Sequence, residues 1–115
     1  VDDEELIRWT LSELLSAQGL RVLEAGNGAQ ARAAFDADTA LAFLDLRLPD
    51  ADGITLAREL LAVAPSCEIY LMTAYLNDNV ADDAKRVGVL RVLDKPFVLE
   101  EIETLAEAVV RAATP

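Results

Sequence analysis

Short apolar runs that stop abruptly at a polar side chain constrain the fold of this chain more than any other feature. Residues 41–44 read Leu-Ala-Phe-Leu and stop at Asp45, and residues 68–72 stop in the same way at Thr73. A third run covers residues 89–93. An apolar run of this length without alternation is typical of a strand that is buried on both faces of a parallel sheet.

Stretches with helical spacing alternate with these runs. Leu11, Leu14 and Leu15 recur on one face of a helix, and Gly19 follows as a natural helix end. A further strand is predicted at 20–25. The predicted helices cover residues 4–18, 29–35, 54–64, 77–87 and 98–113. This alternation with short connections predicts an α/β fold in which helices cover both faces of a parallel sheet.

The first strand of such a fold is not evident in this sequence. A chain of this kind should begin with a strand, but only Val1 precedes the acidic cluster Asp2-Asp3-Glu4. We expect the first strand either to be truncated, with the sequence beginning inside it, or to be unusually short.

Composition bounds the size, the partners and the chemistry of the chain. Its 115 residues, 53% of them hydrophobic, predict a single domain over residues 1–115. A net charge of -11 disfavours binding to nucleic acid and to anionic lipid. No apolar run approaches the roughly 20 residues that span a bilayer, so no membrane association and a cytoplasmic location are expected. One cysteine and no histidine exclude an intrachain disulfide and any site that needs a histidine.

Polar residues collect where the predicted strands end. In an open parallel sheet, ligands bind outside the carboxyl ends of the strands. The residues expected at this edge are Asp2, Asp3, Asp45, Thr73 and Lys95. Three carboxylates brought together repel one another unless a cation lies among them. Oxygen ligands without thiolate or imidazole favour Mg²⁺, so the sequence predicts a magnesium site formed by the three aspartates.

The remaining polar groups at this edge suit a phosphoryl group. Lys95 supplies a positive charge, Thr73 a hydroxyl, and the amide of Ala74 a further donor. Asp45 is the natural nucleophile, because a carboxylate can carry a phosphoryl group as an acyl phosphate. The chain has no Gly-x-x-x-x-Gly-Lys loop that would hold ATP, so the phosphoryl donor must be another molecule.

With these residues, essentially the whole chain resembles the receiver domains of bacterial two-component response regulators. The motifs that carry the resemblance are Val-Asp-Asp-Glu at 1–4, Leu-Asp-Leu-Arg-Leu-Pro-Asp-Ala-Asp-Gly at 44–53, Leu-Met-Thr-Ala-Tyr at 71–75 and Leu-Asp-Lys-Pro-Phe at 93–97. The sequence of residues 6–13 resembles that of receiver domains attached to enhancer-binding transcription activators. The resemblance implies a doubly wound, flavodoxin-like sheet of five parallel strands in the order 2-1-3-4-5.

The resemblance also implies roles for the residues of the site. Asp45 would accept a phosphoryl group from the phosphohistidine of a sensor histidine kinase. Asp3, Asp45 and the backbone carbonyl of Arg47 would bind Mg²⁺ directly, and Asp2 would bind it through water. Thr73 and Lys95 would hold the phosphoryl group, and the Lys95-Pro96 peptide is often cis in the family.

Signal transmission is where the sequence departs from the family. Receivers usually move the residue equivalent to Thr73 and turn an aromatic side chain of the fifth strand inward, which reshapes the face of the fourth helix, fifth strand and fifth helix. Val92 stands at the aromatic position and cannot make that turn. We expect the signal to run through the loop after Thr73 and the fourth helix. The implied partner downstream is an output domain or protein outside this chain, and homodimers through the last strand and helix are common in the family.

The function expected is a phosphoacceptor switch that catalyses only its own phosphorylation and dephosphorylation, and three other functions compete with it. Residues 26–31, Gly-Asn-Gly-Ala-Gln-Ala, fit a dinucleotide fingerprint, but the chain is too short for such a site and Thr73 and Lys95 would stay unexplained. A phosphatase with an aspartyl nucleophile would need an acid where Arg47 stands. A degenerate receiver that acts only as an interaction module is disfavoured by the complete set of site residues, although Val92 fits it.

Overall fold

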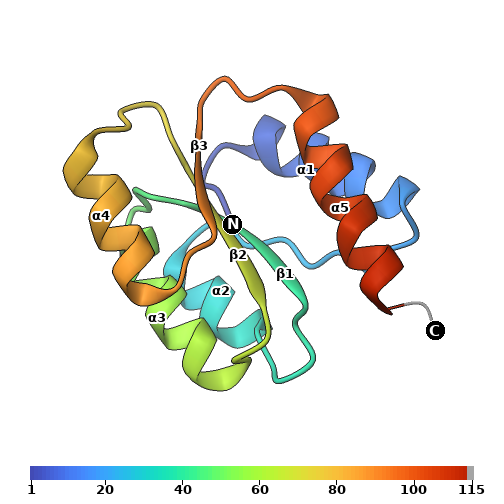
Figure 1. Ribbon diagram of the computed structural model, residues 1–115, viewed down its shortest axis with the longest axis horizontal. Coiled ribbons are helices and arrows are strands. Elements are labelled where there is room, and N and C mark those ends of the chain that lie inside the picture. Colours follow the sequence, from blue (N-terminus) through green and yellow to red (C-terminus); the bar gives the residue numbers. More distant parts are fainter. Residues whose placement is uncertain (114–115) are drawn as a thin grey trace.

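The computed structural model describes residues 1–113, within which five helices surround one three-stranded parallel sheet (Figure 1). The helices are α1 (Glu5–Ala17), α2 (Gly28–Ala34), α3 (Gly53–Val63), α4 (Asp78–Val87) and α5 (Leu99–Ala113). The strands are β1 (Leu41–Asp45), β2 (Glu68–Thr73) and β3 (Arg91–Asp94). The predicted helices and these three strands are confirmed, with bounds that differ by one or two residues. None of the helices described is long and apolar enough to cross a membrane.

The register of the sheet places the polar strand ends at one edge. The strands are parallel in the order β1-β2-β3, with Asp45 beside Met72 and Thr73 beside Asp94. Because parallel strands share a direction, the carboxyl ends of all three meet there. This is the edge on which the sequence predicted the site.

Two of the five expected strands are not regular strands of the sheet, although backbone hydrogen bonds place their segments beside it. Val1 and Asp2 lie beside β1, since the Asp45 amide donates to the Val1 carbonyl at 2.8 Å. On the other side, the Asp2 amide donates to the Ala25 carbonyl at 3.1 Å. The segments therefore follow the expected spatial order. Residues 20–25 do not form the predicted strand: a strand requires a ladder of backbone hydrogen bonds, and the bond between the Asp2 amide and the Ala25 carbonyl does not extend into one.

Alternating side chains of the strands build a core on each face of the sheet. Phe43 and Tyr70 point to the face covered by α1 and α5, where their rings stack with centroids 5.5 Å apart. Leu44 and Leu71 point to the opposite face, which α2, α3 and α4 cover (Figure 1). Burial on both faces explains why these strands read as continuous apolar runs.

Candidate functional site

Three carboxylates gather at the carboxyl edge of the sheet, as the sequence predicted. One oxygen each from Asp2, Asp3 and Asp45 lie within 4.8 Å of one another. Asp2 is fully buried and Asp45 is 8% exposed, whereas Asp3 faces solvent. Asp2 and Asp3 precede α1, and Asp45 is the last residue of β1. The cluster thus has two buried members and one that opens to solvent.

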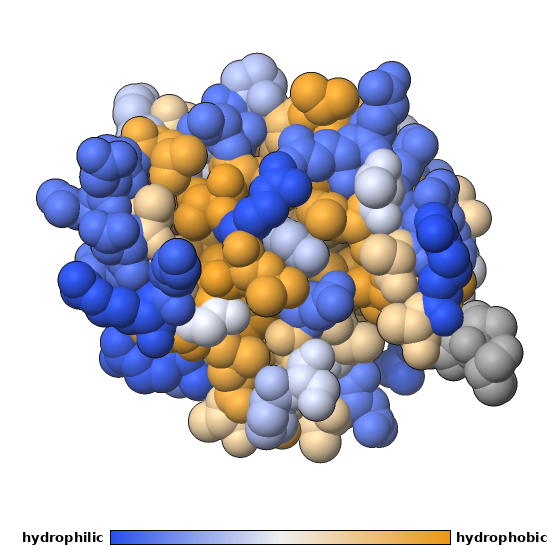
Figure 2. Space-filling view, viewed as in Figure 1, coloured by the Kyte–Doolittle hydropathy of each residue, from blue (hydrophilic) through white to orange (hydrophobic). Residues whose placement is uncertain are grey.

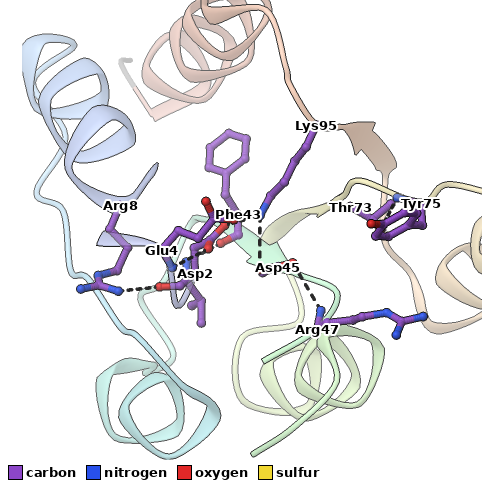
Figure 3. Close-up of polar contacts among 10 residues, drawn as sticks. Asp2, Glu4, Arg8, Phe43, Asp45, Arg47, Thr73, Tyr75 and Lys95 are labelled. Atoms are coloured by element: carbon purple, nitrogen blue, oxygen red, sulfur yellow. Dashed lines mark hydrogen bonds and ion pairs between the residues drawn. The ribbon is translucent and has the colours of Figure 1, made fainter. Parts of the chain in front are cut away.

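Lys95 is the cation of this cluster. Its Nζ lies 2.7 Å from Asp2 Oδ2 and 3.3 Å from Asp45 Oδ2, and both contacts are hydrogen bonds (Figure 3). Nζ also lies 3.6 Å from an oxygen of Glu4, which we did not predict as a site residue. Its position in the acidic cluster of residues 2–4 is the sequence feature that could have identified Glu4. One ammonium therefore balances part of the charge of several carboxylates.

Burial and neighbouring charge shift the protonation equilibria of the site. Burial, followed by the negative charge of Asp2, raises the pKa of Asp45, and Lys95 and the Arg47 amide only partly counter this. Burial alone would lower the pKa of Lys95, but its hydrogen bonds and ion pairs with Asp2 and Asp45 outweigh burial and raise that pKa. The site therefore holds more negative charge than Lys95 can stabilise.

A hard divalent cation fits this donor set. All side-chain donors of the cluster are carboxylate oxygens, which Mg²⁺ prefers. Burial and, after it, the charge of Asp2 raise the pKa of Asp45, and a bound cation would offset both effects. Solvent reaches the cluster at Asp3, so bound water can complete the coordination shell. The residues fit Mg²⁺ on these grounds.

The other predicted site residues lie at the same edge, but not all of them make hydrogen bonds to the acidic cluster. The Arg47 amide donates to Asp45 Oδ1 at 3.3 Å (Figure 3). Thr73 is buried, and its hydroxyl accepts a hydrogen bond from the Tyr75 amide at 3.0 Å. Ala74 is exposed. The Lys95-Pro96 peptide is cis, as the resemblance implied.

Val92, at the position where an aromatic residue was expected, lies partly buried against the core beneath α4. It lines a hollow of about 270 Å³ between α4 and β3, together with Leu76, Ala81, Lys85 and Arg91. A valine side chain has no ring that can turn between an outer and an inner position. The structure therefore offers no aromatic switch at this residue.

The glycine-rich segment before α2 does not form a dinucleotide site. In such a site the first amides of the helix bind a pyrophosphate. Here the amides of Gly28 and Ala29 donate to the carboxylate of Asp50, at 2.6 and 3.0 Å. The anion that these amides bind is thus the chain's own Asp50. The amides are therefore occupied and do not offer a pyrophosphate site, which argues against the dinucleotide hypothesis.

Comparison with known proteins agrees with this geometry. A family model described as the response regulator receiver domain matches residues 1–107. The DNA-binding transcriptional regulator NtrC of Escherichia coli K12 is 33% identical over 108 residues, which are 93% of this chain and 23% of that protein. Sporulation initiation phosphotransferase F of Bacillus subtilis is 31% identical over 103 residues, 89% of this chain and 83% of that protein.

A solved structure adds a chemical precedent. A response regulator protein from Burkholderia pseudomallei, with a phosphorylated aspartic acid, a calcium ion and citrate, superposes with a TM-score of 0.80 at 27% identity. The match covers 98% of this chain and 69% of that one. The doubly wound fold class and the resemblance are both confirmed. The chain belongs to the family of response regulator receiver domains.

Proposed function

We propose that this domain is a phosphoacceptor switch of a two-component pathway and that Asp45 carries the phosphoryl group. The observation that supports Asp45 is the position of its carboxylate in the acidic cluster: Asp45 and Asp2 both accept a hydrogen bond from Lys95, but Asp45 is 8% exposed whereas Asp2 is fully buried. Its place at the end of β1 makes it the only such carboxylate on a strand among residues 1–113.

The proposed reaction is an in-line transfer. A carboxylate oxygen of Asp45 attacks the phosphorus of a phosphohistidine on a sensor kinase; the phosphorus–nitrogen bond breaks and the histidine leaves with the electron pair. Asp3, Asp45 and the Arg47 carbonyl would hold Mg²⁺, with Asp2 acting through water, and the ion would stabilise the charge of the transferred group. Lys95, the Thr73 hydroxyl and the Ala74 amide would hold the phosphoryl oxygens.

Transmission is proposed to start at Thr73. Its hydroxyl now accepts from the Tyr75 amide, so its movement toward a phosphoryl group would break that bond and release the loop that leads to α4. Phosphorylation should therefore change amide chemical shifts in residues 74–78 and along α4. Unchanged shifts in both would contradict this route.

The output is proposed to act through the face formed by α4, β3 and α5. Figure 2 shows apolar side chains gathered over the middle of this face. Leu76, Leu90, Val98 and Leu99 are 39 to 58% exposed. An exposed apolar surface of this kind marks a contact with an output domain, a partner protein or a second copy of the domain.

The test of the proposed function is the intact mass of the protein after incubation with acetyl phosphate and Mg²⁺. A single phosphoryl adduct is expected, which requires Mg²⁺ and disappears in Asp45→Asn. Asp52→Asn is a suitable control, because it changes a nearby carboxylate whose role is to accept from the Thr55 amide at the start of α3. The absence of an adduct would favour the second candidate function, an interaction module independent of phosphorylation. The valine at position 92, where an aromatic residue was expected, is the observation that favours this candidate.

A further inference from the structure

The loop after Asp45 folds back on itself into a closed turn. The Gly53 amide donates to the Leu46 carbonyl at 2.8 Å and closes the base of the loop, residues 46–52. The Leu48 amide donates to the Ala51 carbonyl at 3.0 Å and closes its tip. These bonds define the shape of the loop but do not attach its tip to the rest of the domain.

Asp50 provides that attachment. Its Oδ1 accepts from the Gly28 amide at 2.6 Å and its Oδ2 from the Ala29 amide at 3.0 Å, so both oxygens bind the first turn of α2. These partners are 22 and 21 residues away in the sequence. The hydrogen bond from Gly28 is the chief cause that lowers the pKa of Asp50, which keeps this carboxylate ionised and able to accept both bonds.

The start of α2 is shaped to receive the loop. A Cβ on Gly28 would lie 2.8 Å from the Cβ of Ala51 and 3.1 Å from Asp50 Oδ1. Only glycine allows this approach, since 2.8 Å is well inside the contact distance of two carbon atoms. Asn27 caps α2 separately, because its side chain accepts from the Gln30 amide at 2.8 Å.

We propose that Asp50 is a positioning residue for the cation site. It stands outside the site and acts through Arg47, which lies two residues after Asp45 and three before Asp50. The proposal rests on the proposed function, in which the Arg47 carbonyl binds Mg²⁺. A backbone carbonyl cannot be placed by side-chain rotation, so only the fold of its loop can hold it in position. The bonds from Asp50 to α2 hold that loop at its far end.

The experiment measures Mg²⁺ affinity by following the amide chemical shifts of the site during titration. Asp50→Ala should raise the dissociation constant on the order of tenfold, the lower end of the loss seen when an outer partner of a metal ligand is removed. Asp50→Asn keeps an acceptor oxygen and should recover part of the affinity. The phosphorylation rate of Asp50→Ala should be low at limiting Mg²⁺ and return to about the wild-type rate at saturating Mg²⁺.

The matched control is Asn27→Ala, which removes the side-chain cap of α2 and leaves the loop attached. Both alanine variants should unfold at lower temperature, but only Asp50→Ala should lose Mg²⁺ affinity. Equal affinities in the two variants would overturn the positioning role while wild-type phosphorylation stands. A wild-type protein that binds no Mg²⁺ would overturn the proposed function itself, and the role of Asp50 with it.

Discussion

Lys95 Nζ lies 2.7 Å from Asp2 Oδ2 and 3.3 Å from Asp45 Oδ2, so one ammonium group bridges the two buried carboxylates of the site. The closer partner is Asp2, which is fully buried, and not the proposed phosphoacceptor. Lys95 therefore forms an ion pair with the buried Asp2 carboxylate as well as with the proposed phosphoacceptor.

Replacing Lys95 by methionine should destabilise the metal-free domain by about 1.5–3 kcal/mol, the range for a hydrogen bond to a charged group. Mg²⁺ should restore more stability to this variant than to the wild type, because no ammonium competes for the carboxylates. Urea unfolding with and without Mg²⁺ measures both effects. Lys85→Met, on the exposed part of α4, is the control. An identical Mg²⁺ response in wild type and Lys95→Met would refute this account of the counterion.

Asp45→Asn should stabilise the metal-free protein at pH 7. Burial and the charge of Asp2 raise the pKa of Asp45 in the folded state, so the folded protein binds this proton more tightly than the unfolded chain. Wild-type stability from this group therefore falls as the pH rises from the ordinary pKa of 3.8 through the higher folded value. Asp45→Asn cannot ionise at this position and so avoids the loss of stability. Its greater stability relative to wild type should vanish below pH 3.8.

Thermal unfolding across this pH range, in the presence of a chelator, checks the prediction. Asp82→Asn, an exposed position on α4, serves as the reference for the loss of one negative charge. A melting temperature of Asp45→Asn below that of wild type at pH 7 would show that its contacts with Lys95 and Arg47 outweigh the repulsion.

Gly53→Ala should destabilise the domain by about 1–3 kcal/mol through overpacking. A Cβ at this position would lie 2.5 Å from the Asp45 carbonyl and 2.8 Å from Leu71 Cδ2, and the backbone carbonyl cannot move aside easily. Gly26→Ala is the comparison, because its Cβ would meet first the flexible end of Arg8, at 3.1 Å. Urea midpoints should fall more for Gly53→Ala; equal losses would argue against a tight contact under Asp45.

Cys67 should react slowly with thiol reagents in the native protein. The side chain is buried, and burial raises its pKa to about 11, so almost no thiolate is present at pH 8. Colorimetric thiol titration should show one group that becomes reactive only in denaturant. Rapid labelling of the folded protein at pH 8 would mean that the start of β2 opens to solvent.

The sequence by itself determined the layout of the domain and the edge that carries the site. The apolar runs that end at Asp45 and Thr73 predicted their strands, and the parallel direction of those strands brings both residues to one edge. The helices followed from their apolar spacing, as α3 shows: 54–64 was expected and Gly53–Val63 is observed. Such patterns are local, so they can be read along the chain.

Only the tertiary structure decided which groups touch. It brought Lys95 closer to Asp2 than to Asp45, although 93 residues separate the first pair. It also joined Asp50 to the start of α2, in a segment whose glycines had resembled a nucleotide site. Residues 20–25 have the composition of a strand, yet they meet the segment beside β1 through the bond from the Asp2 amide to the Ala25 carbonyl and form no ladder with it. Contacts of this kind depend on differences of about an ångström in how distant segments pack, and no local pattern encodes them.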